Sequence, residues 1–144
     1  MIRKVTPEQR CFLTLMRTGS RLQAEGDRFF ETITLKQWLV LAELEYSEKP
    51  RSLADLQRAL GTSHQNIRQI AAKLEKKGLI TIAPDPNDSR ACSVSLAEET
   101  EDKPHLYRYK QIAFLRTLFA AIPAADVEAT LRVLEKIEGN LDKL

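Results

Sequence analysis

The stretch 52–96 contains the pattern that most restricts how this chain can fold. Apolar residues such as Leu56 and Leu60 recur at helical spacing until Gly61 interrupts them. A second helical run follows and ends at Gly78, after which the apolar period changes from near four to two. This order predicts two short helices joined by a tight turn and then a pair of strands.

Capping residues mark where each of these two helices begins. Ser52 precedes the first helix and Asp55 follows three positions later, a relative of the capping box. Either Thr62 or Ser63 is expected to cap the second helix. The inner face of this second helix is expected to consist of Ile67, Ile70, Ala71 and Leu74. Two short helices with a glycine-containing turn between them match the helix-turn-helix pattern.

The strand-like interval after these helices predicts a β-hairpin. Residues 79–83 and 92–96 alternate between two faces, and the run Pro84–Arg90 between them is dense in turn-forming residues. We therefore expect two strands joined by a long polar tip. A hairpin placed directly after the second helix of a helix-turn-helix is called a wing.

Four more helices are predicted around this central block. The first begins near Thr6 and Pro7, and the second runs from about Leu35 to Tyr46. The buried side of the second helix is expected to be Trp38, Leu39, Leu41, Ala42 and Leu44. The last two helices are amphipathic and are separated by a break at Pro123. Because the central block cannot also bury the apolar sides of the first, fifth and sixth helices, we expect a partner subunit.

These elements predict a mostly α fold with a small β-wing, that is, a winged helix-turn-helix domain with N- and C-terminal dimerisation helices. A length of 144 residues fits one domain over residues 1–144. Within it we expect the winged helix-turn-helix lobe over residues 33–97. The helical dimerisation region is expected over residues 1–32 and 104–144.

The composition excludes several classes of protein. The chain is 43% apolar and 29% charged, as ordinary soluble proteins are, and no run approaches the ~20 apolar residues of a membrane helix. The N-terminus lacks the apolar core of a signal peptide, so we expect a cytoplasmic protein without a membrane partner. Cys11 and Cys92 lie far apart, and only His64 and His105 are available to join them. We therefore expect no disulfide framework, no metal site and no cofactor.

The charge distribution favours a polyanion as the partner. The net charge is only +2, but residues 63–78 carry four basic residues against one acidic residue, Glu75. A basic helix of this kind is typical of a surface that binds nucleic acid. The sequence contains no phosphate-binding glycine loop, no nucleophile with a base and an orienting partner, and no carboxylate pair in a recognisable frame. The chain is therefore not expected to be an enzyme.

Three segments, in this order and spacing, resemble the MarR family. Ile33–Trp38 resembles the family's opening of the second helix, Lys73–Ile80 its basic exit from the recognition helix, and Asp85–Ala91 its wing tip with the Asp-x-Arg pair. The resemblance covers nearly the whole chain and is strongest over residues 33–96. It implies a homodimeric transcriptional regulator that binds a pseudo-palindromic double-stranded operator, and a repressor released by a small-molecule effector.

Helix-turn-helix proteins place the second helix in the major groove, so its outward residues are the candidate DNA contacts. The side chains able to read adenine or guanine are Gln65, Asn66, Arg68 and Gln69. Contacts to phosphate are assigned to Ser63, His64 and Lys73. In the wing tip, Arg90 is expected to enter a narrow minor groove while Asp88 holds its guanidinium group.

The resemblance also implies two regulatory sites. Family members often bind small aromatic effectors in a cleft between the dimerisation and DNA-binding parts. The candidate lining residues here are Phe12, Phe30 and Trp38, for which core packing is the other explanation. Gln9–Leu13 resembles the first-helix segment of the organic-peroxide sensors within the family. Cys11 is therefore a candidate redox thiol, or else a small apolar filler.

Two alternative functions remain at this point. The chain could be a winged-helix protein-interaction module without DNA binding, which a neutral or acidic recognition helix would favour. It could also be a thiol-based oxidant-sensing regulator that uses Cys11. The basic charge of residues 63–78 argues against the first alternative. The second lacks support from Thr34–Trp38, which contains none of the tyrosines that surround the cysteine in the peroxide sensors.

Overall fold

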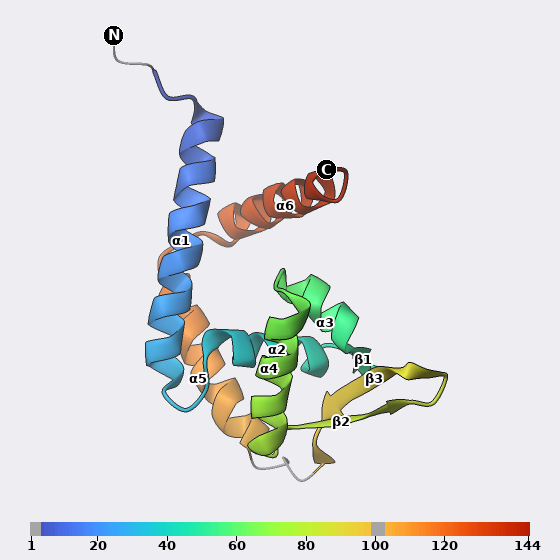
Figure 1. The fold of residues 1–144 in the computed structure, drawn as a ribbon. Helices are drawn as coiled ribbons and strands as arrows, with labels where there is room; N and C mark the ends of the chain where they lie inside the picture. Colours follow the sequence, from blue (N-terminus) through green and yellow to red (C-terminus); the bar gives the residue numbers. More distant parts are fainter. Residues whose placement is uncertain (1–3, 99–102) are drawn as a thin grey trace. The chain divides into compact units, whose positions relative to one another are not determined.

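The computed structural model describes residues 4–98 and 103–144, and the chain divides into two compact units, Met1–Lys110 and Gln111–Leu144. The first unit contains α1 (Pro7–Phe30), α2 (Leu35–Glu45), β1 (Arg51–Ser52), α3 (Leu53–Leu60), α4 (His64–Lys76), β2 (Ile80–Asp85), β3 (Asp88–Leu96) and the start of α5 (Lys103–Leu118) (Figure 1). The second unit contains the rest of α5 and α6 (Ala124–Leu141). The predicted class, mostly helical with a small β-wing, is confirmed.

Helix α1 begins where the sequence predicts, because its first turn carries a complete capping box. The Thr6 hydroxyl accepts a hydrogen bond from the Gln9 backbone N–H at 3.2 Å, and the Gln9 side chain accepts one from the Thr6 backbone N–H at 3.0 Å. The N-terminal half of α1 is exposed and projects away from the other helices of its unit (Figure 1). Only its C-terminal end is buried, at Gly26 and Phe30.

The predicted buried side of α2 is partly wrong. Leu41, Ala42 and Leu44 are buried as expected and Trp38 is half-buried, but Leu39 is 36% exposed. Val40 is fully buried instead, and Gln37 is buried beside it. The reason is that α2 packs against α1, α3, α4 and β3, so more than one stripe of the helix is covered. Gln37 tolerates burial because its side-chain oxygen accepts a hydrogen bond from the Thr34 backbone N–H at 3.2 Å.

The helix-turn-helix forms as the sequence predicts. A capping box joins Ser52 to Asp55 at the start of α3, and Gly61 ends that helix in the left-handed conformation with φ of +61°. Ser63, rather than Thr62, caps α4. The inner face of α4 is confirmed, since all four of its predicted residues are buried: Ile67, Ile70, Ala71 and Leu74.

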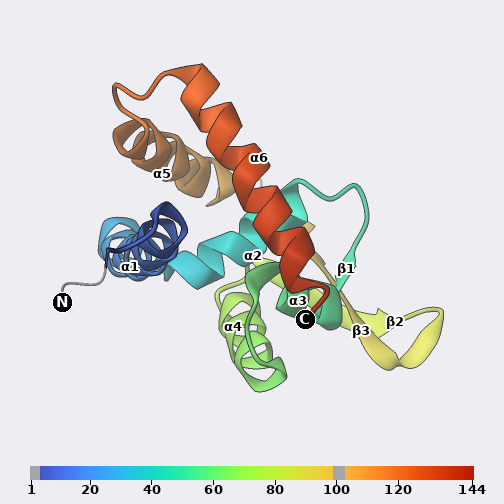
Figure 2. The same ribbon diagram turned by 90° about the horizontal axis from the view of Figure 1, so that it is seen from above.

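The sheet has one strand that the sequence analysis missed and a shorter tip than it predicts. Its strands run antiparallel in the order β1-β3-β2, and the two-residue strand β1 pairs with β3. Pairing between β2 and β3 is regular as far as Pro84 opposite Cys92 and then shifts register to Asp85 opposite Asp88. A tight turn next to an irregularity in β3 therefore replaces the expected long polar tip. The Asp85 carboxylate accepts a hydrogen bond from the Asn87 backbone N–H at 2.8 Å, which closes this turn locally. Figure 2 shows that α4 and the hairpin lie on the same side of α2.

Two glycines in α1 provide a matched test of its packing. A Cβ atom on Gly26 would lie 2.9 Å from Leu35 Cδ1 and 3.1 Å from Leu35 Cβ, whereas one on Gly19 would meet nothing within 4 Å. Gly19→Ala is expected to stabilise the protein by about 0.5–1 kcal/mol, because alanine favours a helix interior over glycine. Gly26→Ala should instead destabilise it by about 1 kcal/mol, since overpacking at Leu35 exceeds that gain. Urea unfolding of both variants checks this, and equal stabilisation by the two would contradict close packing of α1 on α2.

The second unit leaves much of its apolar surface uncovered within one chain. In α6 no residue is buried, and Leu131, Val133 and Leu141 are each more than half exposed. In the part of the chain that the structure describes, no helix is long and apolar enough to cross a membrane.

Candidate nucleic-acid interface

The outward face of α4 presents most of the predicted DNA contacts together. His64, Gln65, Arg68 and Gln69 are exposed, and about one turn further along the helix so is Lys73. These residues lie opposite the buried face that holds α4 against α2 and α3, so the core leaves them free to meet a ligand. The arrangement gives one surface with amide, imidazole, guanidinium and ammonium groups side by side.

Two of the predicted DNA contacts, Ser63 and Asn66, form hydrogen bonds at the turn before α4. Ser63 Oγ accepts a hydrogen bond from the Asn66 backbone N–H at 3.1 Å, and the Asn66 side-chain amide donates to Thr62 Oγ1 at 2.6 Å. Asn66 is therefore half-buried against the turn. Its amide group has one donor already used, which makes it a weaker candidate for reading a base than the exposed Gln65 and Gln69.

The first helix of the motif begins with an ionised capping group. Hydrogen bonds from the Ser52 side chain and from its backbone N–H hold the pKa of Asp55 below the ordinary value of 3.8. Arg58 lies 2.9 Å away in an ion pair, which acts in the same direction. The ionised form of Asp55 therefore stabilises the start of α3.

This arrangement gives a pH dependence of known sign. Because the pKa of Asp55 is lower in the folded state, its contribution to stability is present above about pH 3.8 and is lost as the pH falls through the folded-state pKa. The side chain is 40% exposed, so solvent screens the effect to a few tenths of a kcal/mol. Asp55→Asn should lower the melting temperature slightly at pH 7, and the difference from wild type should shrink towards pH 3. A difference that stays constant with pH would contradict the role of the charge.

The wing tip carries Arg90 in an exposed position, but Asp88 does not hold it as predicted. Asp88 Oδ1 accepts a hydrogen bond from the backbone N–H of Arg90 at 2.9 Å. Within residues 4–98 and 103–144, the guanidinium of Arg90 has no ion pair. Asp88 therefore fixes the backbone of the tip, and the Arg90 side chain extends from this turn into solvent.

The C-terminal end of α4 is tied to two neighbouring segments. The Glu75 carboxylate accepts a hydrogen bond from the Ile82 backbone N–H in β2 at 3.0 Å. The Lys77 ammonium donates to the carbonyl oxygen of Thr32, in the connection between α1 and α2. Neither contact corresponds to a local sequence pattern, so the sequence alone shows these two side chains only as charges.

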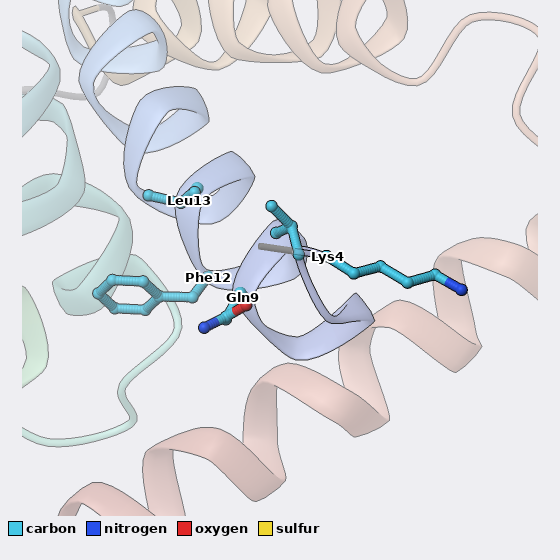
Figure 3. Close-up of a pocket in the computed structure, with 5 residues that line it drawn as sticks. Lys4, Gln9, Phe12 and Leu13 are labelled. Carbon is cyan, nitrogen blue, oxygen red and sulfur yellow. The ribbon is translucent and has the colours of Figure 1, made fainter. Parts of the chain in front are cut away.

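The three candidate effector residues do not come together within one chain. Phe30 is fully buried and stacks on Trp38, with ring centroids 5.6 Å apart and planes 13° apart. Phe12 lies 18 residues earlier on the same helix, which is about 27 Å along its axis. It is 61% exposed and lines a shallow depression of about 370 Å³ with Lys4, Val5, Gln9 and Leu13, where its ring points away from Lys4 (Figure 3).

Both cysteines are free thiols in separate places. Cys11 is exposed in the first turns of α1, and Cys92 is half-buried in β3 opposite Pro84. No group of three or more His, Cys, Asp and Glu side chains is placed to hold a metal ion in the ranges 4–98 and 103–144.

A helix-turn-helix followed directly by a β-hairpin, with a third strand supplied from before α3, defines a winged helix-turn-helix protein. Residues 32–91 match the MarR family. This match covers most of the winged helix-turn-helix segment and agrees with the family resemblance found in the sequence.

Proteins that are similar over nearly the whole chain are transcriptional regulators. The transcriptional activatory protein BadR of Rhodopseudomonas palustris is 29% identical over 141 residues, which cover 93% of this chain and 75% of BadR. A MarR/EmrR family transcriptional regulator from Acinetobacter sp. ADP1 has the same fold, with a TM-score of 0.83 at 15% identity, covering 97% of this chain and all of the other. These relatives are transcriptional regulators and not enzymes, in agreement with the sequence analysis.

A third relative, CouR, has been solved in two states. CouR from Rhodococcus jostii RHA1, bound to p-coumaroyl-CoA, has a TM-score of 0.75 at 16% identity, covering 87% of this chain and 88% of CouR. The transcriptional repressor CouR bound to a 23-mer DNA duplex has a TM-score of 0.73 at 20% identity, covering 86% and 89%. At these identities the likeness establishes the fold.

Proposed function

We propose that this chain is a homodimeric regulator that binds a pseudo-palindromic duplex operator, with α4 in the major groove and the wing tip in the minor groove. The observation that carries the proposal is the outward face of α4, where Gln65, Arg68 and Gln69 are all exposed beside a wing whose Arg90 is also exposed. Amide and guanidinium groups on a major-groove helix are suited to base edges, and an exposed arginine at a wing tip is suited to a narrow minor groove. CouR, which shares the fold, is bound to a DNA duplex.

The contacts divide into two kinds by their chemistry. Arg68, Gln65 and Gln69 would read bases, since each has two polar atoms that match one base edge. His64 and Lys73 lie at the borders of the exposed face and would bind phosphate, together with the Ser63 hydroxyl. Asn66 would add a base contact only through its carbonyl oxygen or its remaining donor, because Thr62 takes the other. Asp88 would act through the shape of the tip.

Exposed apolar side chains support the homodimer. Phe12 and Met16 on α1, and Leu131 and Leu141 on α6, are each more than half exposed. Leu131 and Leu141 belong to a seam that repeats at three- and four-residue spacing along α6, as in helices that pair with one another. We place the dimerisation region in residues 1–32 and 104–144, outside the winged lobe at 33–97. Two recognition helices would then meet half-sites about 34–36 Å apart.

The dimer can be tested with two substitutions on the same helix. Leu131→Asp places a charge in the α6 seam, and Val133→Asp places the same charge off the seam on a residue of similar exposure. We expect sedimentation velocity to show a dimer for the wild type and for Val133→Asp, and a monomer for Leu131→Asp. A wild type that is monomeric at micromolar concentration would overturn the proposed dimer.

DNA binding is tested by fluorescence anisotropy with duplex DNA from upstream of the protein's own gene, across a salt series. Specific binding should weaken steeply with salt, because lysine and arginine displace counterions from phosphate. Arg90→Ala should weaken it, whereas Arg17→Ala, the same change at an exposed site on α1, should not. Equal affinity for this DNA and random DNA would show that the protein does not regulate its own gene. Its operators would then have to be found by selecting binding sites from genomic DNA. No affinity at low salt would overturn the proposal and favour a protein-interaction module.

We further propose that the regulator is a repressor released by a small aromatic effector. CouR is a repressor and is bound to p-coumaroyl-CoA in one structure, while BadR is an activatory protein, so the sign must be measured on the chain's own promoter. A promoter–reporter fusion should be more active when the gene is deleted. Lower activity after deletion would identify an activator. If peroxide reversed the regulation of the promoter in wild type but not in Cys11→Ser, the protein would be an oxidant sensor instead.

A further inference from the structure

A single carboxylate stands out on the basic helix α4. Glu75 is the only acidic residue in the segment 63–78, where it lies among lysines close to the surface proposed to meet phosphate. A negative charge in this position repels a polyanion, so the residue weakens the interaction that the rest of the helix favours. Glu75 Oε2 accepts a hydrogen bond from the Ile82 backbone N–H at 3.0 Å, so the side chain has a structural role besides its charge.

The partner of Glu75 lies on the free edge of the wing. In the strand order β1-β3-β2, β2 has β3 on one side only, and the Ile82 N–H that reaches Glu75 is directed to the other side. Ile82 pairs with Val94 in β3, and Val94 pairs with Arg51 in β1. At this level the hairpin is therefore held from both edges, by β1 on one and by Glu75 of α4 on the other.

Apart from this bond and the packing of α4 on β2, the described hydrogen bonds between the end of α4 and the start of the wing lie at the turn at Gly78. Gly78 has φ of +72°, and the turn is closed by hydrogen bonds from the Gly78 N–H to Glu75 O at 2.9 Å and from the Leu79 N–H to Leu74 O at 3.1 Å. This turn fixes where the chain leaves α4, but it provides one attachment at the start of β2. A second attachment at Ile82 restricts rotation of the hairpin about the first.

The length of the free hairpin shows why the second attachment matters. Beyond Ala83 and Ser93 the wing has only two strands, and its tip lies at Asp85 and Asp88. From Ile82 to Asp85 the strand extends about 10 Å, against about 17 Å from the start of β2, at ~3.4 Å per residue. A given angular motion therefore displaces the tip less when Ile82 is held.

We propose that Glu75 is a positioning residue that sets the wing relative to the recognition helix, so that Arg90 and the exposed face of α4 meet one duplex together. This inference rests on the proposed DNA-binding function. Glu75 acts as a hydrogen-bond acceptor for the wing, and its charge is a cost of that role. The position of the wing affects DNA binding through Arg90, because this side chain lies at the tip and has no ion pair of its own within the described ranges.

Two substitutions separate the acceptor from the charge. Glu75→Gln and Glu75→Ala both remove the negative charge, but only glutamine keeps an oxygen that can accept from Ile82. Operator affinity is measured by anisotropy for each variant, in the wild-type background and in Arg90→Ala. We expect Glu75→Gln to bind at least as well as wild type and Glu75→Ala to bind about tenfold more weakly than Glu75→Gln, or about 1.4 kcal/mol. In the Arg90→Ala background the two should bind equally.

A second measurement needs no DNA. Amide hydrogen exchange of Ile82 should be faster in Glu75→Ala than in Glu75→Gln, while exchange of the buried Ile70 should be the same in both, which shows that the fold is intact. Equal operator affinity of the two variants would overturn the proposal, as would a loss that persists in Arg90→Ala. If wild type bound no DNA while Ile82 exchange still depended on Glu75, the contact would stand but both the proposed function and this positioning role would fall.

Discussion

Replacing Arg68 with alanine is expected to cost about 1–3 kcal/mol of operator affinity and to relax the sequence preference at one base pair. Arg68 is exposed on the first turns of α4, directly after the buried Ile67, so its guanidinium can reach a base edge without disturbing the core. A bidentate contact to guanine is lost entirely in this variant, because alanine offers no donor. The measurement is anisotropy with a set of operators that each carry one substituted base pair.

Lys73→Ala is the matched control for this prediction. Lys73 is exposed five residues nearer the end of the helix, about one and a half turns, and it is assigned to phosphate. Its loss should weaken binding to operator and random DNA alike and should lower the slope of log affinity against log salt by about 1. If Arg68→Ala weakened all duplexes equally and left the base preference intact, Arg68 would be a phosphate contact and base reading would lie with Gln65 and Gln69.

Local signals account for what the sequence predicted well. The starts of α1 and α3 follow from capping residues three positions apart, Thr6 with Gln9 and Ser52 with Asp55. The inner face of α4 follows from its period, and the end of α3 at Gly61 from the left-handed backbone that glycine adopts readily. Each of these features is decided within one or two turns of chain, so the sequence carries them without reference to the rest of the fold.

Contacts between distant segments account for most of the features that the sequence does not predict. Strand β1 is two residues long and exists because Arg51 and Ser52 meet Val94 and Ser93, which a local pattern cannot show. Val40 is buried and Leu39 exposed because several elements enclose α2. The contact of Glu75 with Ile82 joins a side chain to a backbone group across the turn at Gly78.

Two of the candidate effector residues, Phe12 and Phe30, lie far apart within one chain. They are 18 residues apart on one continuous helix, which separates them by about 27 Å. The structure leaves Phe30 with Trp38 as an aromatic pair in the core and Phe12 on an exposed apolar surface. The two phenylalanines should therefore respond differently to the same substitution.

Phe30→Ala is expected to lower the free energy of unfolding by about 3–5 kcal/mol, because it removes a fully buried aromatic side chain and leaves a cavity. The loss includes the stacked contact with Trp38 and the edge contact with Phe29, whose ring centroid lies 5.8 Å away. Trp38 is the only tryptophan in the chain, so its fluorescence reports urea unfolding at the site of the change.

Phe12→Ala makes the same chemical change on the exposed part of α1. At concentrations low enough for both proteins to be monomeric it should alter stability by no more than about 0.5 kcal/mol. At concentrations at which the wild type is dimeric it should be less stable than wild type, because a residue in a dimer interface contributes through association. If Phe30→Ala cost less than about 1 kcal/mol, the core around Trp38 would tolerate an opening of aromatic size. The site beside Trp38 would then become the place to look for an effector, with added small aromatic compounds expected to restore the stability that the substitution removes.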